Sequence, residues 1–349
     1  MRIVVVGATG NVGTSVLESL ATEQAVEEVI AVARRAPRVE FPRTSFVAAD
    51  ICRSDLAAIF RGADAVVHLA WLIQPGRNES ITHAVNVDGS RRVFDAVVHA
   101  RVPLLVYASS VGAYSPGPKD RLVDESWPTE GIRTSFYSRH KAAVERELDR
   151  LEREQPAVRV IRIRPGLIFK AQAATEIRRL FAGPLFPGWL ANPAVIPIAP
   201  RTPRLRFQAV HSLDVGDAYR RALLSDARGA FNVAAEPPIG AAELAGVLRA
   251  RPVPVSAALL RGAAALTFAL RMQPSEPGWV DMALQVPLMD SARARQELGW
   301  TPTRSALEAL EELLSGLRQG AHFPTPPLQR ATSGPLRLRE LITGLGSRP

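Results

Sequence analysis

The stretch Ile3-Val4-Val5-Val6-Gly7-Ala8-Thr9-Gly10-Asn11-Val12-Gly13 lies at the start of the chain and decides its fold. The four apolar residues 3–6 are typical of a strand that is buried on both faces, as in a parallel sheet. A helical pattern over Val12–Thr22 follows directly. A strand, a glycine-rich turn and a helix in this order predict the first half of a βαβ unit.

The spacing of the glycines indicates a dinucleotide site. In such a loop Gly7 permits the tight turn, Gly10 lets a pyrophosphate approach the backbone, and Gly13 permits close packing of helix on strand. The N-terminus of the helix then offers free N–H groups to the phosphates. A glycine-rich turn that binds nothing is the alternative, and the position of the motif between a strand and a helix favours the dinucleotide.

The end of the second predicted strand bears on the kind of dinucleotide. An acidic residue about 20 positions beyond the glycines would bind the ribose 2′-hydroxyl of NAD, but the chain has Ala33-Arg34-Arg35 there. Two guanidinium groups suit a 2′-phosphate because arginine binds phosphate through its planar fork. We therefore expect NADP, with NAD as the alternative if both arginines are ordinary surface residues. Asp50, after the third strand, could reach the adenine amino group.

Short apolar runs and helical patterns alternate over the first half of the chain. Strands separated by helices of this length predict an α/β fold, the Rossmann doubly wound parallel sheet with helices on both faces. Further strands are expected at Val29–Ala33, Phe46–Ala49, Ala65–Leu69, Leu104–Ala108 and Val158–Ile163, and helices at Asp55–Phe60, Asn86–His99 and Tyr137–Glu154.

The regular alternation stops after Pro165, which suggests a division into domains. We expect a dinucleotide-binding Rossmann domain over 1–170, with returns near 205–235 at Phe207–Val210 and Phe231–Val233. A smaller, mostly helical and discontinuous C-terminal substrate lobe is expected over 171–204 and 236–318. A loosely held extension over 319–349, with the prolines of Pro324-Thr-Pro-Pro327, would complete the chain.

Composition narrows the class of protein. The chain has 349 residues, of which 47% are apolar and 22% charged, as expected of a large globular protein. The net charge of +9 comes from scattered basic residues, so we interpret it as a solvated surface and expect no nucleic-acid and no membrane partner. Cys52 is the single cysteine, which leaves no internal disulfide and indicates a reducing, cytoplasmic location. The early first strand leaves no room for a signal peptide, and the apolar run 255–270 is broken by Arg261 and too short to span a bilayer.

Short motifs along the chain resemble those of the extended short-chain dehydrogenase/reductases, including the NAD-dependent epimerase/dehydratase group. Each motif alone is weak, and their order and spacing carry the resemblance, which extends to about residue 315. The motifs are Gly7-x-x-Gly10-x-x-Gly13, Asp50-Ile51, His68-Leu-Ala70, Asn86-Val-Asp-Gly89, Tyr107-Ala-Ser-Ser-Val-Gly-Ala-Tyr114, Tyr137-Ser-Arg-His-Lys141, Arg164-Pro165-Gly166, Val210-His211-Ser-Leu-Asp214-Val215 and Glu297-Leu-Gly-Trp300-Thr-Pro302.

The resemblance implies a catalytic site of Ser110, Tyr137 and Lys141. In that family the tyrosine is the acid/base, the lysine bonds the nicotinamide ribose, and the serine hydrogen-bonds the substrate oxygen. Four residues on a helix place Tyr137 and Lys141 on one face, and the Lys141 cation would lower a tyrosine pKa that is ordinarily near 10. A chance Tyr/Lys pair and a serine that only ends its strand are the alternatives.

The same resemblance implies the rest of the cofactor site. Pro165 and Gly166 would border the nicotinamide carboxamide, Trp71 would lie close to the nicotinamide, and Asn86 would hold backbone near the site. The residues expected to bind the cofactor are Gly7, Thr9, Gly10, Asn11, Val12, Gly13, Arg34, Arg35, Asp50, Ile51, Leu69, Ala70, Trp71, Asn86, Ala108, Pro165 and Gly166. His68 and His211 lack metal-ligand spacing, so we interpret both as structural and expect no metal.

The substrate is less determined. Nucleotide-sugar members of the family typically carry an Asn after the strand that matches 158–163 and an Arg four residues before the His that matches His211. This chain lacks that Asn and has Phe207 at the Arg position, which argues against a nucleotide sugar. Apolar residues could form a pocket for a hydrophobic ketone, aldehyde or alcohol, or could equally be ordinary core: Trp71, Leu72, Phe181, Leu185, Phe186, Trp189 and Leu190.

These observations predict an NAD(P)-dependent oxidoreductase that transfers hydride between nicotinamide and a small-molecule carbonyl or alcohol substrate, with Tyr137 as acid/base. One alternative is a sugar-nucleotide epimerase or dehydratase with a tightly held cofactor. Another is a non-enzymatic, dinucleotide-sensing scaffold. The resemblance also implies a homodimer through the helices at 86–99 and 137–154.

Overall fold

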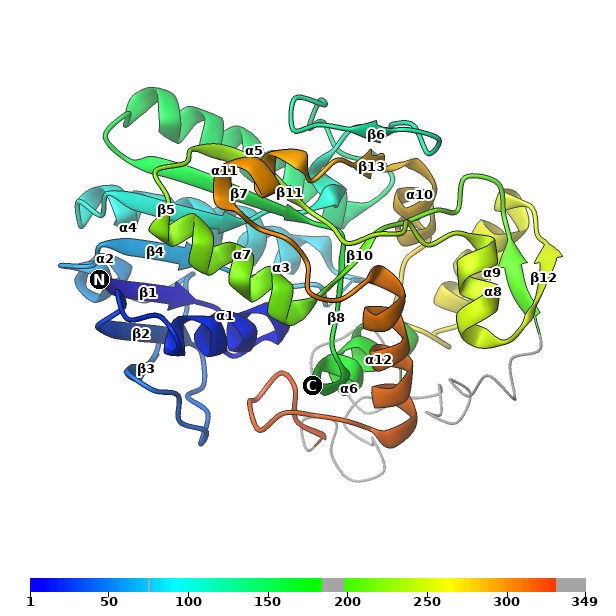
Figure 1. The fold of residues 1–349 in the computed structure, drawn as a ribbon, viewed down its shortest axis with the longest axis horizontal. Helices are drawn as coiled ribbons and strands as arrows, with labels where there is room; N and C mark the ends of the chain where they lie inside the picture. Colours follow the sequence, from blue (N-terminus) through cyan, green and yellow to red (C-terminus); the bar gives the residue numbers. More distant parts are fainter. Residues whose placement is uncertain (75, 184–197, 331–349) are drawn as a thin grey trace.

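The computed structural model describes residues 1–74, 76–183 and 198–330, and a parallel sheet of seven strands forms the centre of this part (Figure 1). The strand order is β11-β7-β5-β4-β1-β2-β3. The order reverses between β1 and β4, which confirms the doubly wound Rossmann fold. The strands are β1 (Arg2–Val6), β2 (Glu28–Ala33), β3 (Thr44–Ala48), β4 (Ala65–His68), β5 (Leu104–Ala108), β7 (Arg159–Pro165) and β11 (Gly229–Val233).

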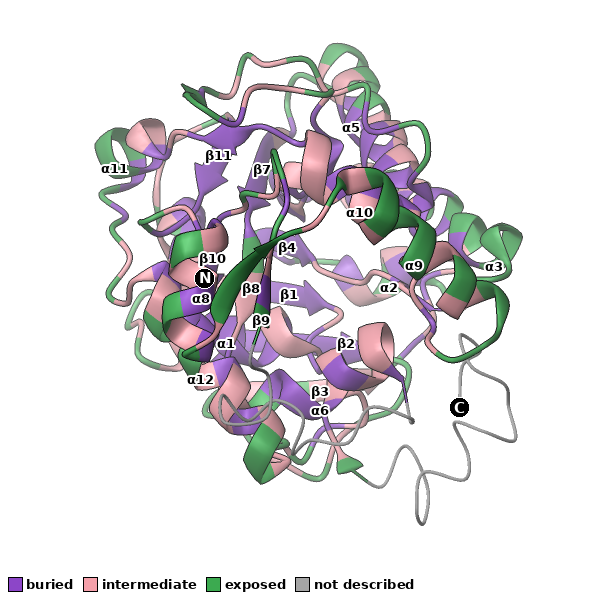
Figure 2. Ribbon diagram, turned by 90° about the vertical axis from the view of Figure 1, so that its right-hand side faces the viewer, coloured by how far each residue is buried: buried purple, intermediate pink, exposed green. Residues whose placement is uncertain are grey.

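Helices cover both faces of the sheet, and Figure 2 shows the strands as the buried centre. Ile3 and Val5 of β1 lie in the core of one face, and Val4 and Val6 lie in the core of the other. Successive strand side chains alternate between faces, so a strand buried on both sides is a continuous apolar run. The first face carries α1 (Asn11–Ala21), α7 (Ser212–Leu224) and α11 (Ala292–Leu298), and the second carries α2 (Leu56–Phe60), α4 (Gly89–His99) and α5 (Phe136–Glu154).

The later segments build a smaller lobe at one end of the sheet (Figure 1). Its helices are α6 (Ala174–Ile177), α8 (Ala241–Leu248), α9 (Ala257–Ala269), α10 (Gly278–Gln285) and α12 (Ala306–Gln319). Short strand pairs support it: β8 (Leu167–Phe169) with β10 (Ala209–His211), β9 (Ile198–Arg201) with β12 (Arg251–Pro254), and β6 (Leu122–Val123) with β13 (Leu288–Met289). Irregular turns and a short helix complete the fold: α3 (Glu79–His83), η1 (Ala84–Asp88), η2 (Val111–Ala113), η3 (Ala171–Ala173) and η4 (Arg178–Ala182).

The two expected returns to the Rossmann sheet differ in the structure. β11 lies at the edge of the main sheet beside β7, whereas the segment expected at 207–210 forms β10, which pairs with β8 outside that sheet. The reason lies at Gly166, where the backbone comes so near that a Cβ would lie 2.5 Å from the Gln208 carbonyl oxygen. β10 therefore follows the continuation of β7 into the lobe.

The end of the described chain returns to the glycine loop. The Thr325 hydroxyl donates a hydrogen bond to the Thr9 carbonyl at 2.8 Å, and Leu328 is fully buried. The Phe323 ring lies 6.3 Å from the Phe41 ring, between centroids. The tail strap, residues 323–328, is thus held against the Rossmann domain, although it falls within the extension expected to be loosely held; residues 331–349 lie outside the described residues.

Candidate dinucleotide cleft and catalytic residues

The glycine loop forms a cradle at the end of β1. Gly7 has φ of +88°, where side chains are strained, and a Cβ there would lie 2.6 Å from the Ala70 amide nitrogen. A Cβ on Gly13 would lie 2.5 Å from the Gly7 carbonyl oxygen. A Cβ on Gly10 would meet only that oxygen, at 3.7 Å, so packing does not require a glycine there. Gly10 instead leaves open the N-terminus of α1, whose first turn has no acidic residue, and this cradle fits a phosphate group.

A cleft runs from this loop along the ends of the neighbouring strands. Ten of the residues expected to bind the cofactor line it: Gly7, Thr9, Gly10, Arg34, Arg35, Asp50, Ile51, Leu69, Ala70 and Trp71. The opposite wall comes from the lobe and the tail strap, and no local sequence signal identified it: Glu176, Arg179, Leu180, Pro274, Pro326 and Pro327. The cleft is therefore enclosed by segments that lie far apart in the sequence.

Charged side chains gather at the end of the cleft formed by β2 and β3. Arg34 and Arg35 follow β2 and are exposed toward solvent. Burial of part of the guanidinium lowers the pKa of Arg34, while the nearby Asp50 carboxylate favours its cation. Asp50 also accepts a hydrogen bond from the Cys52 amide at 2.9 Å, which fixes the turn after β3. This end of the cleft has both cations for a phosphate and a carboxylate for an amino group.

Seven residues expected to bind the cofactor do not line the cleft in the described part of the chain. Asn86 is fully buried and exchanges two hydrogen bonds with the Leu72 backbone, at 2.7 and 2.8 Å. The Asn11 amide donates to the Ile168 carbonyl at 3.3 Å. The others lie behind the cleft wall or beyond it, in the first turn of α1 or at the ends of β5 and β7: Val12, Gly13, Ala108, Pro165 and Gly166.

The structure brings Ser110, Tyr137 and Lys141 together at the C-terminal ends of the central strands. Ser110 follows β5, and its hydroxyl accepts a hydrogen bond from the Gly112 amide at 3.0 Å. The Ser110 side chain lies near enough to the Tyr137 hydroxyl to lower the pKa of that tyrosine. Tyr137 lies in the first turn of α5 and Lys141 one turn later, and the Lys141 ammonium donates to the Ala108 carbonyl at 2.6 Å.

The pKa values of this group differ from expectation. Burial raises the pKa of Tyr137 to about 12, and the nearby Ser110 side chain opposes this rise only in part. Burial also lowers the pKa of Lys141 well below its ordinary value. The expected lowering of the Tyr137 pKa by Lys141 is therefore wrong for this arrangement. The reason is geometric: the ammonium points at Ala108 and lies 5.8 Å from the centroid of the Tyr137 ring.

Trp71 separates the cleft from Ser110, Tyr137 and Lys141. Its ring lies 3.5 Å from the Lys141 ammonium and 5.8 Å from the Tyr137 ring, measured to centroids. Its indole Nε1 is buried and has no hydrogen-bond partner within the described residues. A buried donor without a partner is unfavourable, so an acceptor oxygen on a ligand in the cleft would satisfy this group. Together with the open cradle at Gly10, this orphaned donor shows that the residues present fit a dinucleotide.

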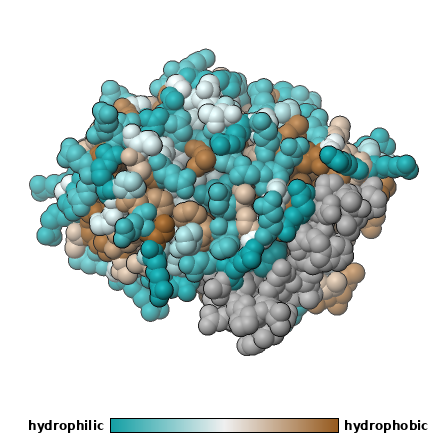
Figure 3. Space-filling model, turned by 60° about the horizontal axis from the view of Figure 1, so that its bottom comes forward, coloured by the Kyte–Doolittle hydropathy of each residue, from teal (hydrophilic) through white to brown (hydrophobic). Residues whose placement is uncertain are grey.

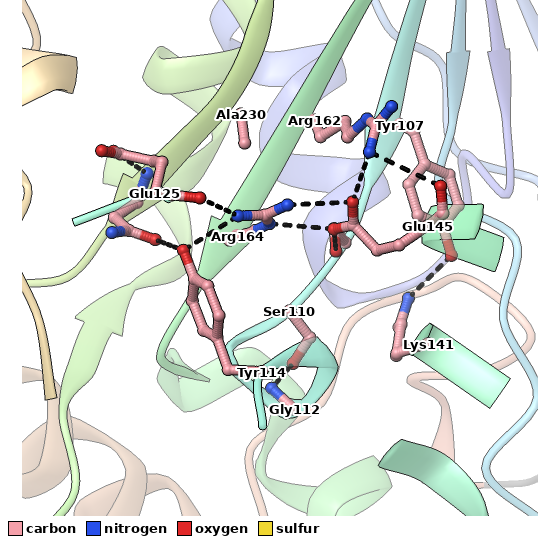
Figure 4. Close-up of polar contacts among 12 residues, drawn as sticks. Tyr107, Ser110, Gly112, Tyr114, Glu125, Lys141, Glu145, Arg162, Arg164 and Ala230 are labelled. Carbon is pink, nitrogen blue, oxygen red and sulfur yellow. Dashed lines mark hydrogen bonds and ion pairs between the residues drawn. The ribbon is translucent and has the colours of Figure 1, made fainter. Parts of the chain in front are cut away.

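A buried ionic network lies beside Ser110 and Lys141 (Figure 4). Glu145, one turn after Lys141, is fully buried and accepts hydrogen bonds from Arg164 at 2.9 and 3.0 Å, from Arg162 at 2.8 Å, and from the Ser109 hydroxyl. Burial raises the pKa of Glu145, but the two arginines outweigh it and hold the pKa at about 2. Arg164 also donates to the Tyr114 hydroxyl at 3.0 Å. The network therefore joins α5 to the ends of β5 and β7.

Apolar rings surround Tyr137 on the lobe side. The Trp279 ring lies 4.9 Å from the Tyr137 ring, and the Phe181 ring lies 4.9 Å from the Trp279 ring, between centroids. Leu72 lines the cleft. Trp279, in α10, was not predicted because no spacing in the sequence relates it to Tyr137. The remaining apolar candidates fall outside the described residues: Leu185, Phe186, Trp189 and Leu190.

The two histidines of the motifs have protein partners. His68 is fully buried, its Nε2 is hydrogen-bonded to the Ser90 hydroxyl at 2.9 Å, and burial lowers its pKa to about 3. His211 Nδ1 accepts from the Leu213 amide at 3.2 Å, and the ring pairs with Glu312. Across residues 1–74, 76–183 and 198–330, no three His, Cys, Asp or Glu side chains are placed to hold a metal ion. Within the same ranges, no helix is both long and apolar enough to cross a membrane.

Comparisons with known proteins agree with this geometry. The chain is 26% identical over 327 residues to Uncharacterized protein Rv0501 of Mycobacterium tuberculosis, covering 90% of this chain and 83% of that protein. It is 33% identical over 107 residues to the sterol-4-alpha-carboxylate 3-dehydrogenase ERG26 of Saccharomyces cerevisiae, covering 31% and 30%. Its fold resembles the UDP-glucose 4-epimerase of Thermus thermophilus in complex with NAD, with a TM-score of 0.67, 20% identity, and 91% and 99% of the two chains covered. The model of the NAD dependent epimerase/dehydratase family matches residues 3–234, and the chain belongs to this family.

Proposed function

We propose that the chain is an NAD(P)-dependent oxidoreductase of the short-chain dehydrogenase type, acting on a carbonyl or alcohol substrate. The observation that carries the proposal is that Ser110 and Tyr137 come together, with Lys141 one helical turn from Tyr137, at the sheet edge that also bears the glycine cradle. Ligands of open α/β sheets bind at this edge, where the strand order reverses. A hydride transfer with a tyrosine as acid/base requires neither a metal ion nor a nucleophilic side chain.

When bound, a nicotinamide cofactor supplies the hydride or accepts it. The chain's own residues supply the proton and the positioning. Tyr137 gives its hydroxyl proton to the substrate oxygen during reduction and takes it back during oxidation, while Ser110 donates a hydrogen bond to the same oxygen. Lys141 is positioned to stabilise the phenolate of Tyr137 once its ammonium leaves the Ala108 carbonyl. Proximity and orientation would supply the larger part of the rate enhancement.

The preferred cofactor in this proposal is NADP, with NAD as the alternative. Arg34 and Arg35 support it, because both line the cleft directly after β2, where an acidic residue would serve NAD. Asp50 would accept a hydrogen bond from the adenine amino group. Several structural neighbours are complexes with NAD, including the Thermus thermophilus epimerase, so cofactor preference is the first property to measure.

The proposed substrate is a hydrophobic ketone, aldehyde or alcohol. The rings of Trp71, Trp279 and Phe181 around Tyr137 support an apolar substrate. The partial relatives include a protein named sterol-4-alpha-carboxylate 3-dehydrogenase, and a sterol is a largely apolar molecule. Association of two copies through α4 and α5, and a cytoplasmic location, remain predictions.

The test is a fluorescence titration of the purified protein with NADPH and with NADH, followed by a screen of carbonyl compounds for NADPH consumption. Replacing Arg34 and Arg35 together by Ala should raise the Kd for NADPH by at least about a hundredfold, since each charged hydrogen bond contributes about 1.5–3 kcal/mol, and leave the Kd for NADH unchanged. Tyr137→Phe should leave both Kd values unchanged and lower turnover at least about a hundredfold. Undiminished turnover in Tyr137→Phe would reject the catalytic assignment, and binding of neither nucleotide would reject the proposed enzyme. Binding of a nucleotide without turnover of any carbonyl compound would favour the dinucleotide-sensing scaffold.

A second candidate is a sugar-nucleotide epimerase or dehydratase. Several structural neighbours support it by name, among them a dTDP-glucose 4,6-dehydratase from Streptomyces venezuelae with NAD bound. An epimerase regenerates its cofactor in each cycle and shows no net consumption. Stoichiometric NADPH oxidation with a simple carbonyl compound would therefore exclude this candidate, and a cofactor that copurifies with the protein would favour it.

A further inference from the structure

Helix α9 exposes its apolar side chains to solvent. Leu259, Leu266 and Leu270 are 64%, 60% and 62% exposed, and none of the residues of α9 is buried. The intervals of seven and four residues place the three leucines on one face of the helix. Figure 2 shows α9 as mostly exposed, and Figure 3 shows hydrophobic side chains at the right-hand end of the molecule, where Figure 1 places the smaller lobe. Contiguous exposed leucines of this kind mark interaction surfaces.

The chain segment that contains α9 carries charges of one sign. The sequence from 244 to 275 has four arginines and no Asp or Glu: Arg249, Arg251, Arg261 and Arg271. Arg261 pairs with Asp281 at 2.8 Å, whereas Arg249, Arg251 and Arg271 are exposed. Arg77 adds a fifth cation beside the helix, with its guanidinium 3.9 Å from the centroid of the Phe268 ring. Exposed leucines on a helix with arginines in the adjoining segments favour a membrane interface, where apolar side chains enter the lipid and arginines meet anionic headgroups.

We propose that the α9 face docks on an anionic lipid surface, which departs from the absence of a membrane partner expected from the scattered basic residues. The α9 face means Leu259, Leu266 and Leu270 with the arginines of the adjoining segments, Arg249, Arg251 and Arg271. The helix would lie in the plane of the interface, so the shortness of the 255–270 run, which forbids a span, is no obstacle. Charge complementarity selects lipid over a second copy of the chain. In a two-fold symmetric dimer the same patch of each copy faces the other. The arginines of the two copies would then meet, and residues 244–275 contain no carboxylate to pair with them.

Docking in this orientation would also bring the cleft to the lipid. The chain leaves α9 and reaches Pro274 within a few residues, and Pro274 lines the cleft wall. Gln74 joins the two sides there, because its amide donates to the carbonyls of Pro274 at 3.3 Å and Leu180 at 2.8 Å. Lipid-dissolved apolar compounds would then meet the mouth of the cleft directly. Docking itself does not depend on the proposed reaction.

The experiment is cosedimentation of the full chain with vesicles of equal parts phosphatidylcholine and phosphatidylglycerol, and with phosphatidylcholine vesicles alone. The wild type should sediment with the anionic vesicles, and less so as salt is raised. Replacing Leu259 and Leu266 together by Glu should abolish sedimentation. Leu224→Glu, at a leucine 41% exposed at the end of α7, is the matched control and should bind as the wild type does.

A second variant removes charge without endangering the fold. Arg249 and Arg271 have positive φ, 50° and 56°, at the ends of α8 and α9, where glycine is favoured. Replacing both by Gly should therefore preserve the fold and lower the vesicle partition coefficient about fivefold for each arginine. Equal binding to the neutral vesicles, or undiminished binding by this variant, would overturn the proposal. The proposal would also be overturned if the wild type does not bind vesicles but forms a concentration-dependent dimer in sedimentation velocity. Loss of that dimer in the Leu259/Leu266 variant would identify a second copy of the chain as the partner of this face.

Discussion

The buried carboxylate of Glu145 offers the sharpest quantitative test of the structure. Glu145→Gln keeps the shape of the side chain and removes its charge, leaving Arg164 and Arg162 with a neutral amide between them. Arg162 retains Asp149 and Glu152 as partners, whereas Arg164 retains the Tyr114 hydroxyl and the Glu125 carbonyl. We therefore expect the variant to fold with a reduced free energy of unfolding.

The magnitude follows from the carboxyl pKa. Arg164 and Arg162 outweigh the effect of burial and bring the pKa of Glu145 from its ordinary value of 4.5 to about 2. This difference corresponds to about 3 kcal/mol of stability at neutral pH. The pKa is lowered in the folded state, so the contribution is fully present above the unfolded value of 4.5 and is lost as the pH falls toward 2. Loss of one partner of a buried ion pair typically costs about 3–5 kcal/mol, which agrees in size.

The assay is guanidinium unfolding of the wild type and of Glu145→Gln at pH 7 and at several lower pH values. The stability difference should be about 3 kcal/mol at pH 7 and should shrink steadily below about pH 4.5. Asp149→Asn is the matched control on the same helix. It also removes an ion pair with Arg162, but its side chain is 47% exposed, so about 1 kcal/mol or less should be lost. A difference below about 1 kcal/mol for Glu145→Gln, or one that is constant with pH, would refute the reasoning.

Three further predictions concern the cleft. Gly7→Ala should lower both the melting temperature and the affinity for NADPH, because its methyl group would lie 2.6 Å from the Ala70 nitrogen at φ of +88°; Gly246→Ala, with nothing within 4 Å, is the control and should do neither. Thr325→Val should reduce the free energy that holds the tail strap against the glycine loop by about 1 kcal/mol, because the hydrogen bond to Thr9 is lost. Trypsin should then cleave faster at Arg330, and an unchanged cleavage rate would show that other contacts hold the strap. Burial raises the pKa of Glu176, in the cleft wall, to about 7, so this carboxyl becomes negatively charged as the pH rises through 7. NADH should therefore bind more weakly above pH 7 than below it, and Glu176→Gln should remove this pH dependence of the Kd. A pH dependence that persists in the variant would contradict the assignment.

Local patterns were sufficient to locate most of the sheet. Ile3–Val6 and Leu104–Ala108 are continuous apolar runs because both faces of β1 and β5 are covered, and such runs are visible in any single sequence. The edge strand β3 begins two residues earlier than expected, at Thr44, because an edge strand has less need of apolar residues. The segment around Ala209 resembles a sheet strand equally well, but a local pattern does not specify its partner, and that partner is β8.

The proximity of Ser110, Tyr137 and Lys141 could be predicted because their spacing is local or their motif is distinctive. Tyr137 and Lys141 are one helical turn apart, and Ser110 follows a recognisable strand. The opposite wall of the cleft had no such signal, since Pro327 lies more than three hundred residues from the Thr9 loop that it faces. The orientation of individual side chains could not be predicted from the sequence either. The position of the Lys141 ammonium depends on the Trp71 ring and the Ala108 carbonyl together.

The same tertiary contacts link the two halves of the site. With the Trp71 ring against Lys141, burial favours the neutral forms of both side chains: it lowers the pKa of Lys141 and raises that of Tyr137 to about 12. The indole Nε1 of Trp71 meanwhile has no hydrogen-bond partner within the described residues, and the ring borders the cleft. A polar ligand that fills the cleft beside Trp71 would satisfy the indole and displace its ring from the ammonium. In the mechanism that we propose, proton transfer by Tyr137 would then depend on occupation of the cleft, because Trp71 both borders the cleft and covers the Lys141 ammonium.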